Sequence, residues 1–194
     1  LAREDDAVSA AVATILRRDG VTVLTNHRAV AVLPDVAGFT LRTDHAGTTV
    51  DLGFDRLLIA IGRTPRVTGY GLEELGIPLR KAGTIETDDG LATLHPTIFA
   101  CGDVTGPYQL THIAGFQGGF AALNALFAPF WRFKPNYRAV PAVTYTSPEI
   151  ARVGLNERDA AAQGIACEIT RYDFTELDRA IAEADTEGLS LIHI

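Results

Sequence analysis

The sequence predicts an α/β fold, and three patterns support this prediction. Apolar residues with helical spacing open the chain, and short β-like runs follow them. The almost continuous apolar run at 57–62 is typical of a strand that is buried on both faces of a parallel sheet. A second apolar run, at 97–101, leads into a long helical pattern at 109–127. Strands that alternate with helices in this way are typical of α/β proteins.

The first helix is expected to begin at Asp5 or Asp6. Its apolar residues are followed by Arg17 and Arg18 and then by Gly20. Acidic residues at the start and basic residues at the end complement the helix dipole, and glycine is a common stop. After this helix we expect a meander of short strands at 21–24, 29–33, 39–42 and 48–51, separated by Pro34-Asp35, Gly38 and a turn at 44–47.

Residues 66–94 are expected to connect two packed units. They are rich in Gly, Pro and acidic residues, with a short helical turn at 72–75. The helix at 109–127 carries many small residues, which permit close packing against a sheet or a ligand. Beyond it we expect a linker at 129–141, a strand at 142–146, a capped helix from Asn156 to Gly164, a strand at 167–172 and an edge strand at 189–194.

Composition excludes several classes of protein. The chain has 194 residues with 47% hydrophobic residues, which is enough apolar material for a core and excludes disorder. Its 17 Lys+Arg against 24 Asp+Glu give a net charge of −7, and no basic run appears, so we expect no nucleic-acid or membrane partner. No apolar stretch approaches the roughly 20 residues of a membrane-spanning helix, and no secretory signal pattern is present. The two cysteines, Cys101 and Cys167, are far apart, which favours a reducing, cytoplasmic compartment.

The start of the chain has a further implication. Met is absent from the whole sequence, and the first residue is Leu1. We therefore expect the chain to be a processed product or an internal fragment of a longer protein.

Asp103 is the residue most suited to ligand binding. It follows the predicted strand at 97–101 and precedes a turn and a helix. A carboxylate at the end of a parallel strand can accept hydrogen bonds from sugar-like hydroxyls, and the free N–H groups of the next helix can face an anionic or electron-rich ligand. The alternative is that Asp103 only caps the turn.

Four segments form a recognisable combination: the run Thr93-Leu-His-Pro-Thr-Ile-Phe-Ala-Cys-Gly-Asp103 and residues 57–65, 110–114 and 141–155. Together they resemble the pyridine nucleotide-disulfide oxidoreductases, the class I flavoproteins that include glutathione reductase, dihydrolipoamide dehydrogenase and mercuric reductase. The run 93–103 is similar to the second FAD-binding motif of that family. Residues 57–65 resemble the strand and Gly-Arg-x-Pro turn that end its NAD(P)-binding domain. Residues 110–114 resemble the start of the helix beneath the flavin, and residues 141–155 the opening of the dimerisation domain. The resemblance extends from about Leu1 to Gly188.

The resemblance implies a partial flavoprotein with two dinucleotide-binding domains, followed by the start of an α+β dimerisation domain. Residues 1–65 would be the end of the NAD(P)-binding domain, 66–134 the end of the FAD-binding domain and 135–188 the start of the dimerisation domain. Residues 189–194 depart from the family pattern and form an atypical tail. We also expect a homodimer when the protein is intact.

The resemblance also assigns cofactor-binding roles. Asp103 would accept a hydrogen bond from a flavin ribitol hydroxyl, and the main-chain N–H of Thr111 would lie near the flavin C2 carbonyl. Gly62 and the main chain of Gln109 and Val143 would line the nicotinamide pocket. The full set of predicted binding residues is Gly62, Gly102, Asp103, Gln109, Leu110, Thr111 and Val143.

Several parts that the family needs are not found in this sequence. Neither of the two Gly-x-Gly-x-x-Gly phosphate loops is present. We expect the redox-active cysteine pair to lie upstream of Leu1 and the His-Glu acid/base pair beyond Ile194, so no catalytic residue is assigned. The five histidines show no metal-ligand spacing, and no metal site is predicted. His112 is kept as a residue close to the flavin.

The predicted function is part of an FAD-dependent NAD(P)H oxidoreductase that passes hydride from nicotinamide to flavin and on to a disulfide or metal-ion acceptor. The segments at 119–126 and 146–156 favour the mercuric reductase-like branch, and the fragment alone is expected to be inactive. Two alternatives stay open: a ferredoxin or rubredoxin reductase relative without redox cysteines, and a non-catalytic nucleotide-binding or interaction module.

Overall fold

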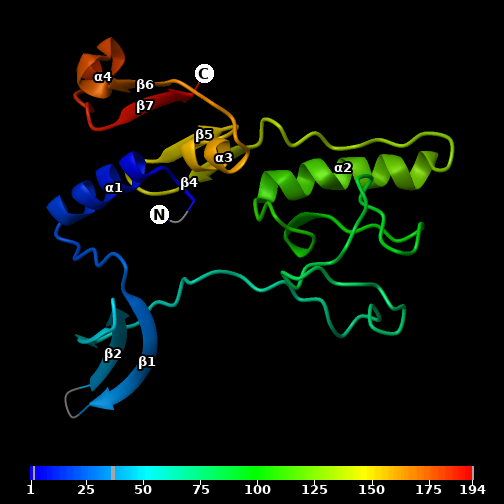
Figure 1. The fold of residues 1–194 in the computed structure, drawn as a ribbon, viewed down its shortest axis with the longest axis horizontal. Helices are drawn as coiled ribbons and strands as arrows, with labels where there is room; N and C mark the ends of the chain where they lie inside the picture. The colour runs from blue at the N-terminus through cyan, green and yellow to red at the C-terminus, as the bar shows by residue number, and fades with distance from the viewer. Residues whose placement is uncertain (2, 36–37, 194) are drawn as a thin grey trace. The chain divides into compact units, whose positions relative to one another are not determined.

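The structure, a computed structural model, describes residues 1, 3–35 and 38–193, which form two compact units (Figure 1). One unit consists of Leu1–Ile61 and Asn156–Ile194 and is called the terminal unit. The other consists of Gly62–Leu155 and is called the central unit. The secondary structure mixes helices and strands, in agreement with the predicted α/β class.

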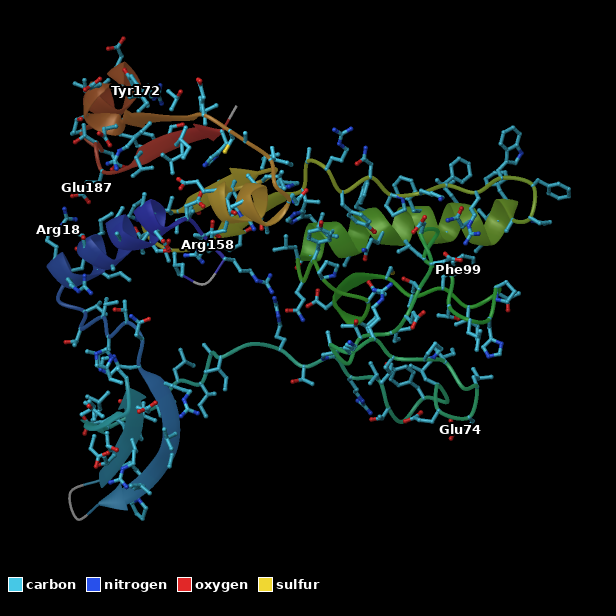
Figure 2. The ribbon with its side chains drawn as sticks, viewed as in Figure 1. Arg18, Glu74, Phe99, Arg158, Tyr172 and Glu187 are labelled. Carbon is cyan, nitrogen blue, oxygen red and sulfur yellow. The ribbon has the colours of Figure 1, made fainter. Side chains whose placement is uncertain are left out.

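The terminal unit opens with helix α1 (Asp6–Arg18), as the charge pattern predicts. Asp5 occupies the N-cap position, and Arg17 and Arg18 lie in the last turn. The Arg18 guanidinium donates to the Glu187 carboxylate over 2.7 Å, a contact between the two sequence segments of this unit (Figure 2). The Arg18 and Glu187 side chains are 59% and 41% exposed, so water screens the pair and it contributes little to stability.

A three-stranded antiparallel meander follows in the order β1-β2-β3. Strands β1 (Arg28–Asp35), β2 (Gly38–His45) and β3 (Thr48–Phe54) confirm three of the four predicted runs. Arg42 and Asp51 are cross-strand partners joined by two hydrogen bonds of 2.9 and 2.7 Å. The hydrogen bond from Arg42 holds the pKa of the Asp51 carboxyl below its usual range.

Two of the predicted strands of the terminal unit are wrong. Residues 21–24 and 57–62 have no regular secondary structure. Leu58 and Ile61 are 89% and 91% exposed, whereas the sequence predicts burial. A buried parallel strand requires neighbouring strands on both sides for its backbone hydrogen bonds. None of the strands described in the structure pairs with 57–62, so the run stays extended and exposed.

The C-terminal part of the terminal unit contains the expected capped helix. The Asn156 side chain accepts from the N–H of Asp159 over 2.9 Å and begins helix α3 (Glu157–Ala162). The Asn156 amide also donates to the Arg3 carbonyl over 3.0 Å, so one buried side chain joins the two segments of the unit. Strands β6 (Ile169–Asp173) and β7 (Leu189–His193) pair antiparallel, with a short helix η2 (Phe174–Glu176) and helix α4 (Asp178–Glu183) between them.

The central unit has a small apolar core beside one long helix. Leu72, Ile77, Ile85 and Ala100 form the buried cluster. The predicted strand at 97–101 is reduced to an isolated bridge between Ala92 and Phe99, because the neighbouring segment pairs with it at that position alone. The short helix η1 (Gly102–Val104) follows, and then helix α2 (Thr111–Phe127), strand β4 (Pro141–Thr144) and strand β5 (Ile150–Val153), which pairs antiparallel with β4.

The connection between α2 and β4 is irregular, as predicted, and a buried amide fixes it. The Asn124 side chain donates to the carbonyls of Gly90 and Phe133, both over 2.8 Å, and accepts from the Phe133 N–H over 2.8 Å. Asn124 is only 2% exposed, so these bonds determine the path of two loops. None of the helices in the described part of the chain is long and apolar enough to cross a membrane.

Candidate functional site

The turn that starts the site requires glycine at position 102. Gly102 is buried and has a φ of +79°, a backbone conformation that disfavours other residues. A Cβ atom placed there would lie 3.0 Å from the Cβ of Ala114 in α2, which is closer than normal packing allows. The Gly102 N–H donates to the Gln117 Oε1 over 2.6 Å. The turn therefore packs directly on α2, and glycine leaves room for that contact.

Asp103 follows in η1 and keeps an accessible carboxylate. Its side chain is 43% exposed, and its Oδ2 lies 3.8 Å from the Arg63 Nε. Arg63 also donates to the Gln109 carbonyl over 2.9 Å. One guanidinium thus links two predicted binding residues, Asp103 and Gln109, to the turn that begins at Gly62. A half-exposed carboxylate can still accept a hydrogen bond from a ligand hydroxyl.

The N-terminus of α2 is suited to a group that carries negative charge. Leu110 occupies the N-cap position and has no side-chain acceptor, and the first turn contains no acidic residue. Thr111, the first residue of the helix, is exposed. Because no side chain caps this end, the first N–H groups of a 17-residue helix keep their partial positive charge for a ligand.

A hydrogen bond brings strand β4 to the same end of α2. The His112 Nε2 lies 2.8 Å from the Pro141 carbonyl, which is within hydrogen-bond distance. Pro141 begins the strand that holds Val143. Gly62 has a φ of +130°, and a Cβ atom placed there would meet no atom within 4 Å. Position 62 therefore borders open space, as a residue beside a planar ring would need.

All seven predicted binding residues lie in the central unit. Two residues that hold the site were not predicted as members of it: Arg63 and Gln117. Arg63 belongs to the Gly-Arg-x-Pro turn, so the motif carried a signal for it. Gln117 gave no signal, because a glutamine inside a helical pattern looks the same whether it is buried or exposed.

A second group of polar side chains lies in the terminal unit. Asp5, Glu157 and His193 each offer one ligand atom, and these three atoms all lie within 4.8 Å of one another. Such a set could hold a metal ion. The sequence spacing predicts no metal site, because these residues come from three distant segments. Asp5 already has a structural role, since its Oδ1 accepts from the Glu157 N–H over 3.0 Å. His193 lies at the end of strand β7 (Leu189–His193).

Comparison with known families settles the relationship of the chain. The sequence pattern of the family described as pyridine nucleotide-disulphide oxidoreductase matches residues 1–118. The chain belongs to this family. A second pattern, the dimerisation domain of the pyridine nucleotide-disulphide oxidoreductases, matches residues 140–192. The predicted resemblance and the predicted order, nucleotide-binding region before dimerisation domain, are both confirmed.

Individual members of the pyridine nucleotide-disulphide oxidoreductase family match over nearly the whole chain. The mercuric reductase of Streptomyces lividans is 35% identical over 187 residues, which are 96% of this chain and 39% of that protein. The dihydrolipoyl dehydrogenase of Geobacillus stearothermophilus is 35% identical over 173 residues, which are 89% of this chain and 36% of that protein. The chain thus spans little more than a third of the length of these relatives.

Solved structures of family members share the fold. LpdA from Mycobacterium tuberculosis is similar with a TM-score of 0.81 and 29% identity, over 98% of this chain and 40% of that one. The HOCl-induced flavoprotein disulfide reductase RclA from Escherichia coli is similar with a TM-score of 0.79 and 27% identity, over 100% of this chain and 43% of that one.

Proposed function

We propose that the chain forms part of an FAD-dependent NAD(P)H oxidoreductase, in which the central unit holds the flavin end of FAD. The observation that carries this proposal is the arrangement of Gly102, Asp103 and the uncapped start of α2 in one compact unit. Membership of the pyridine nucleotide-disulphide oxidoreductase family supports it.

The residues present fit this cofactor in three respects. Asp103 offers an accessible carboxylate, which is the acceptor that a ribitol hydroxyl needs. The first turn of α2 offers unpaired N–H groups, which stabilise negative charge near the flavin C2 carbonyl. Gly62 leaves its surroundings free for a planar ring such as nicotinamide.

Each predicted binding residue then has a defined role. Gly102 allows the turn to approach α2, and Asp103 accepts the ribitol hydrogen bond. The Leu110–Thr111 backbone presents N–H groups at the helix start, and the main chain of Gln109 and Val143 lines the nicotinamide side together with Gly62. The chemistry that bound FAD supplies is acceptance of a hydride from NAD(P)H and its onward transfer to a disulfide or a metal ion.

The proposal extends to the whole protein. The match to the dimerisation domain supports a homodimer, and the mercuric reductase and dihydrolipoyl dehydrogenase relatives support an acceptor that is a small-molecule disulfide or a metal ion. The scarcity of cysteine supports a cytoplasmic location. Because these 194 residues contain neither Gly-x-Gly-x-x-Gly phosphate loop, we expect the chain alone to be inactive.

The test is the substitution Asp103→Ala in the full-length polypeptide that contains these residues. Loss of a charged acceptor typically costs about 1.5 to 3 kcal/mol, so the dissociation constant for FAD should rise roughly ten- to hundred-fold. Asp103→Asn keeps a neutral acceptor and should show a smaller rise. Asp89→Ala is the matched control, because Asp89 is exposed and forms an ion pair with Lys134 on the surface.

The measurement is FAD bound per chain after dialysis, together with titration of the apoprotein by flavin fluorescence. Equal FAD content in Asp103→Ala and in the parent protein would contradict the assigned role. A full-length parent that is colourless and indifferent to FAD would favour the non-catalytic module instead.

A further inference from the structure

The turn that carries Asp103 is held by a buried side chain on α2. Gln117 is 2% exposed, and its Oε1 accepts from the Gly102 N–H over 2.6 Å. Gly102 is itself buried, so without Gln117 its N–H would lose this acceptor away from water. Buried amide groups without partners are costly, so this bond fixes the backbone directly before Asp103.

A second bond determines which end of the Gln117 amide faces the turn. The backbone N–H of Gly102 can only donate, so Oε1 must point toward it, and Nε2 points the other way. There Nε2 donates to the Tyr137 hydroxyl over 2.9 Å. Tyr137 thus satisfies the donor end of the amide and prevents its rotation.

Tyr137 is fixed in turn by aromatic contacts. Its ring stacks on Tyr108 with a centroid distance of 5.2 Å and an interplanar angle of 27°. It also meets Phe116 edge-on at 6.4 Å. Tyr108 lies just before α2 and Phe116 lies on it, so the hydroxyl is held at one position relative to that helix.

We infer that Gln117 is a positioning residue for the Gly102-Asp103 turn, and that Tyr137 orients it from the connection before the dimerisation domain. The inference rests on the proposed function, because the turn matters only if Asp103 holds the flavin. It adds a residue pair that acts through Gly102 and does not touch the cofactor. It also makes flavin affinity depend on a residue in the segment 119–139, which lies between the two matched regions.

The experiment compares three variants in the full-length polypeptide. Gln117→Leu removes both bonds at similar volume, Tyr137→Phe removes only the hydroxyl, and Gln117→Glu keeps an acceptor toward Gly102. Gln163→Leu and Tyr145→Phe are matched controls, because Gln163 and Tyr145 are exposed outside this network.

Two readouts are measured in each variant. The first is hydrogen exchange at the Gly102 amide in the apoprotein, which does not depend on flavin. Gln117→Leu should speed this exchange roughly ten- to hundred-fold, Tyr137→Phe should speed it less, and Gln117→Glu should retain most of the protection. The second is FAD binding, measured as the dissociation constant and as the visible flavin spectrum. Across the three variants the dissociation constant should rise, and the flavin absorption bands should broaden, in the same order.

The outcomes separate this inference from the proposed function. If Asp103→Ala weakens FAD binding but Gln117→Leu changes neither readout, the positioning role is overturned and the flavin site stands. If Gln117→Leu speeds Gly102 exchange but neither Asp103→Ala nor Gln117→Leu changes the affinity for FAD, the proposed function fails, and with it the inference. If Gln117→Glu behaves like Gln117→Leu in both readouts, the acceptor toward Gly102 is not what matters, and the inference fails.

Discussion

Replacement of Asn124 by Leu should release the two loops that this side chain holds. The substitution preserves approximate volume and removes three hydrogen bonds, to the Gly90 carbonyl and to both backbone groups of Phe133. The bond to Gly90 is fully buried, and its loss leaves a carbonyl without a partner at a cost of about 1–3 kcal/mol. The two bonds to Phe133 are partly buried, and water can replace part of each, so they add about 0.5–1.5 kcal/mol apiece.

The three ranges add to about 2–6 kcal/mol, which corresponds to an increase of roughly 30-fold to 10⁴-fold in the local opening equilibrium. The assay is native-state hydrogen exchange of the full-length polypeptide, because it reports each loop separately and does not require two-state unfolding. The Phe133 amide is the direct probe, since it donates to the Asn124 Oδ1.

Asn136→Leu provides the control for this experiment. Asn136 is exposed and accepts from the nearby Arg138 N–H, so the same chemical change should leave exchange at Phe133 unaltered. Asn124→Asp adds a further check, because the carboxylate still accepts from Phe133 but has no N–H for the two carbonyls. Unchanged protection of Phe133 in Asn124→Leu would refute the reasoning.

Three further predictions concern other contacts. Burial raises the pKa of Asp88, but hydrogen bonds from Arg132 and from two loop amides outweigh it, so the folded pKa lies below the ordinary value. The resulting stabilisation is present above the pKa of the unfolded state and is lost as the pH falls through the pKa of the folded state. Arg132→Leu should therefore raise the Asp88 pKa in a carboxyl NMR titration. Gly102→Ala should lower FAD content through about 1–2 kcal/mol of left-handed backbone strain plus the contact with Ala114, and adding Ala114→Gly should recover only the contact part. Asn156→Ala should cost α3 about 1–2 kcal/mol and speed amide exchange in its first turn, whereas Asn156→Asp, which keeps the cap acceptor, should change it less.

Local patterns of the sequence predicted the elements that depend on local interactions. The charges and the glycine around α1, the turn before Thr48 and the cap at Asn156 each act within a few residues, and the structure has these elements where the sequence places them. The run at 57–62 depends on neighbouring strands instead, so its composition could predict a strand but could not supply the partners.

The same distinction applies to the candidate site. Asp103 and Thr111 lie in a continuous motif, so the sequence alone could identify them. The bonds of Arg63 to Gln109 and of Gln117 to Gly102 join residues 46 and 15 positions apart. Such contacts follow from the packing of the whole unit, so the sequence alone could not predict which residues form these bonds.

The exposed run at 57–62 has a practical consequence for handling the chain. Leu57, Leu58, Ile59 and Ile61 are all exposed, and the segment has strong β propensity without charge. Unpaired segments of this composition act as templates for intermolecular strand pairing and aggregation. Arg56 and Arg63 flank the run as charged gatekeepers, and a lysine in place of Ile59 would reinforce them where soluble material of this 194-residue chain is needed.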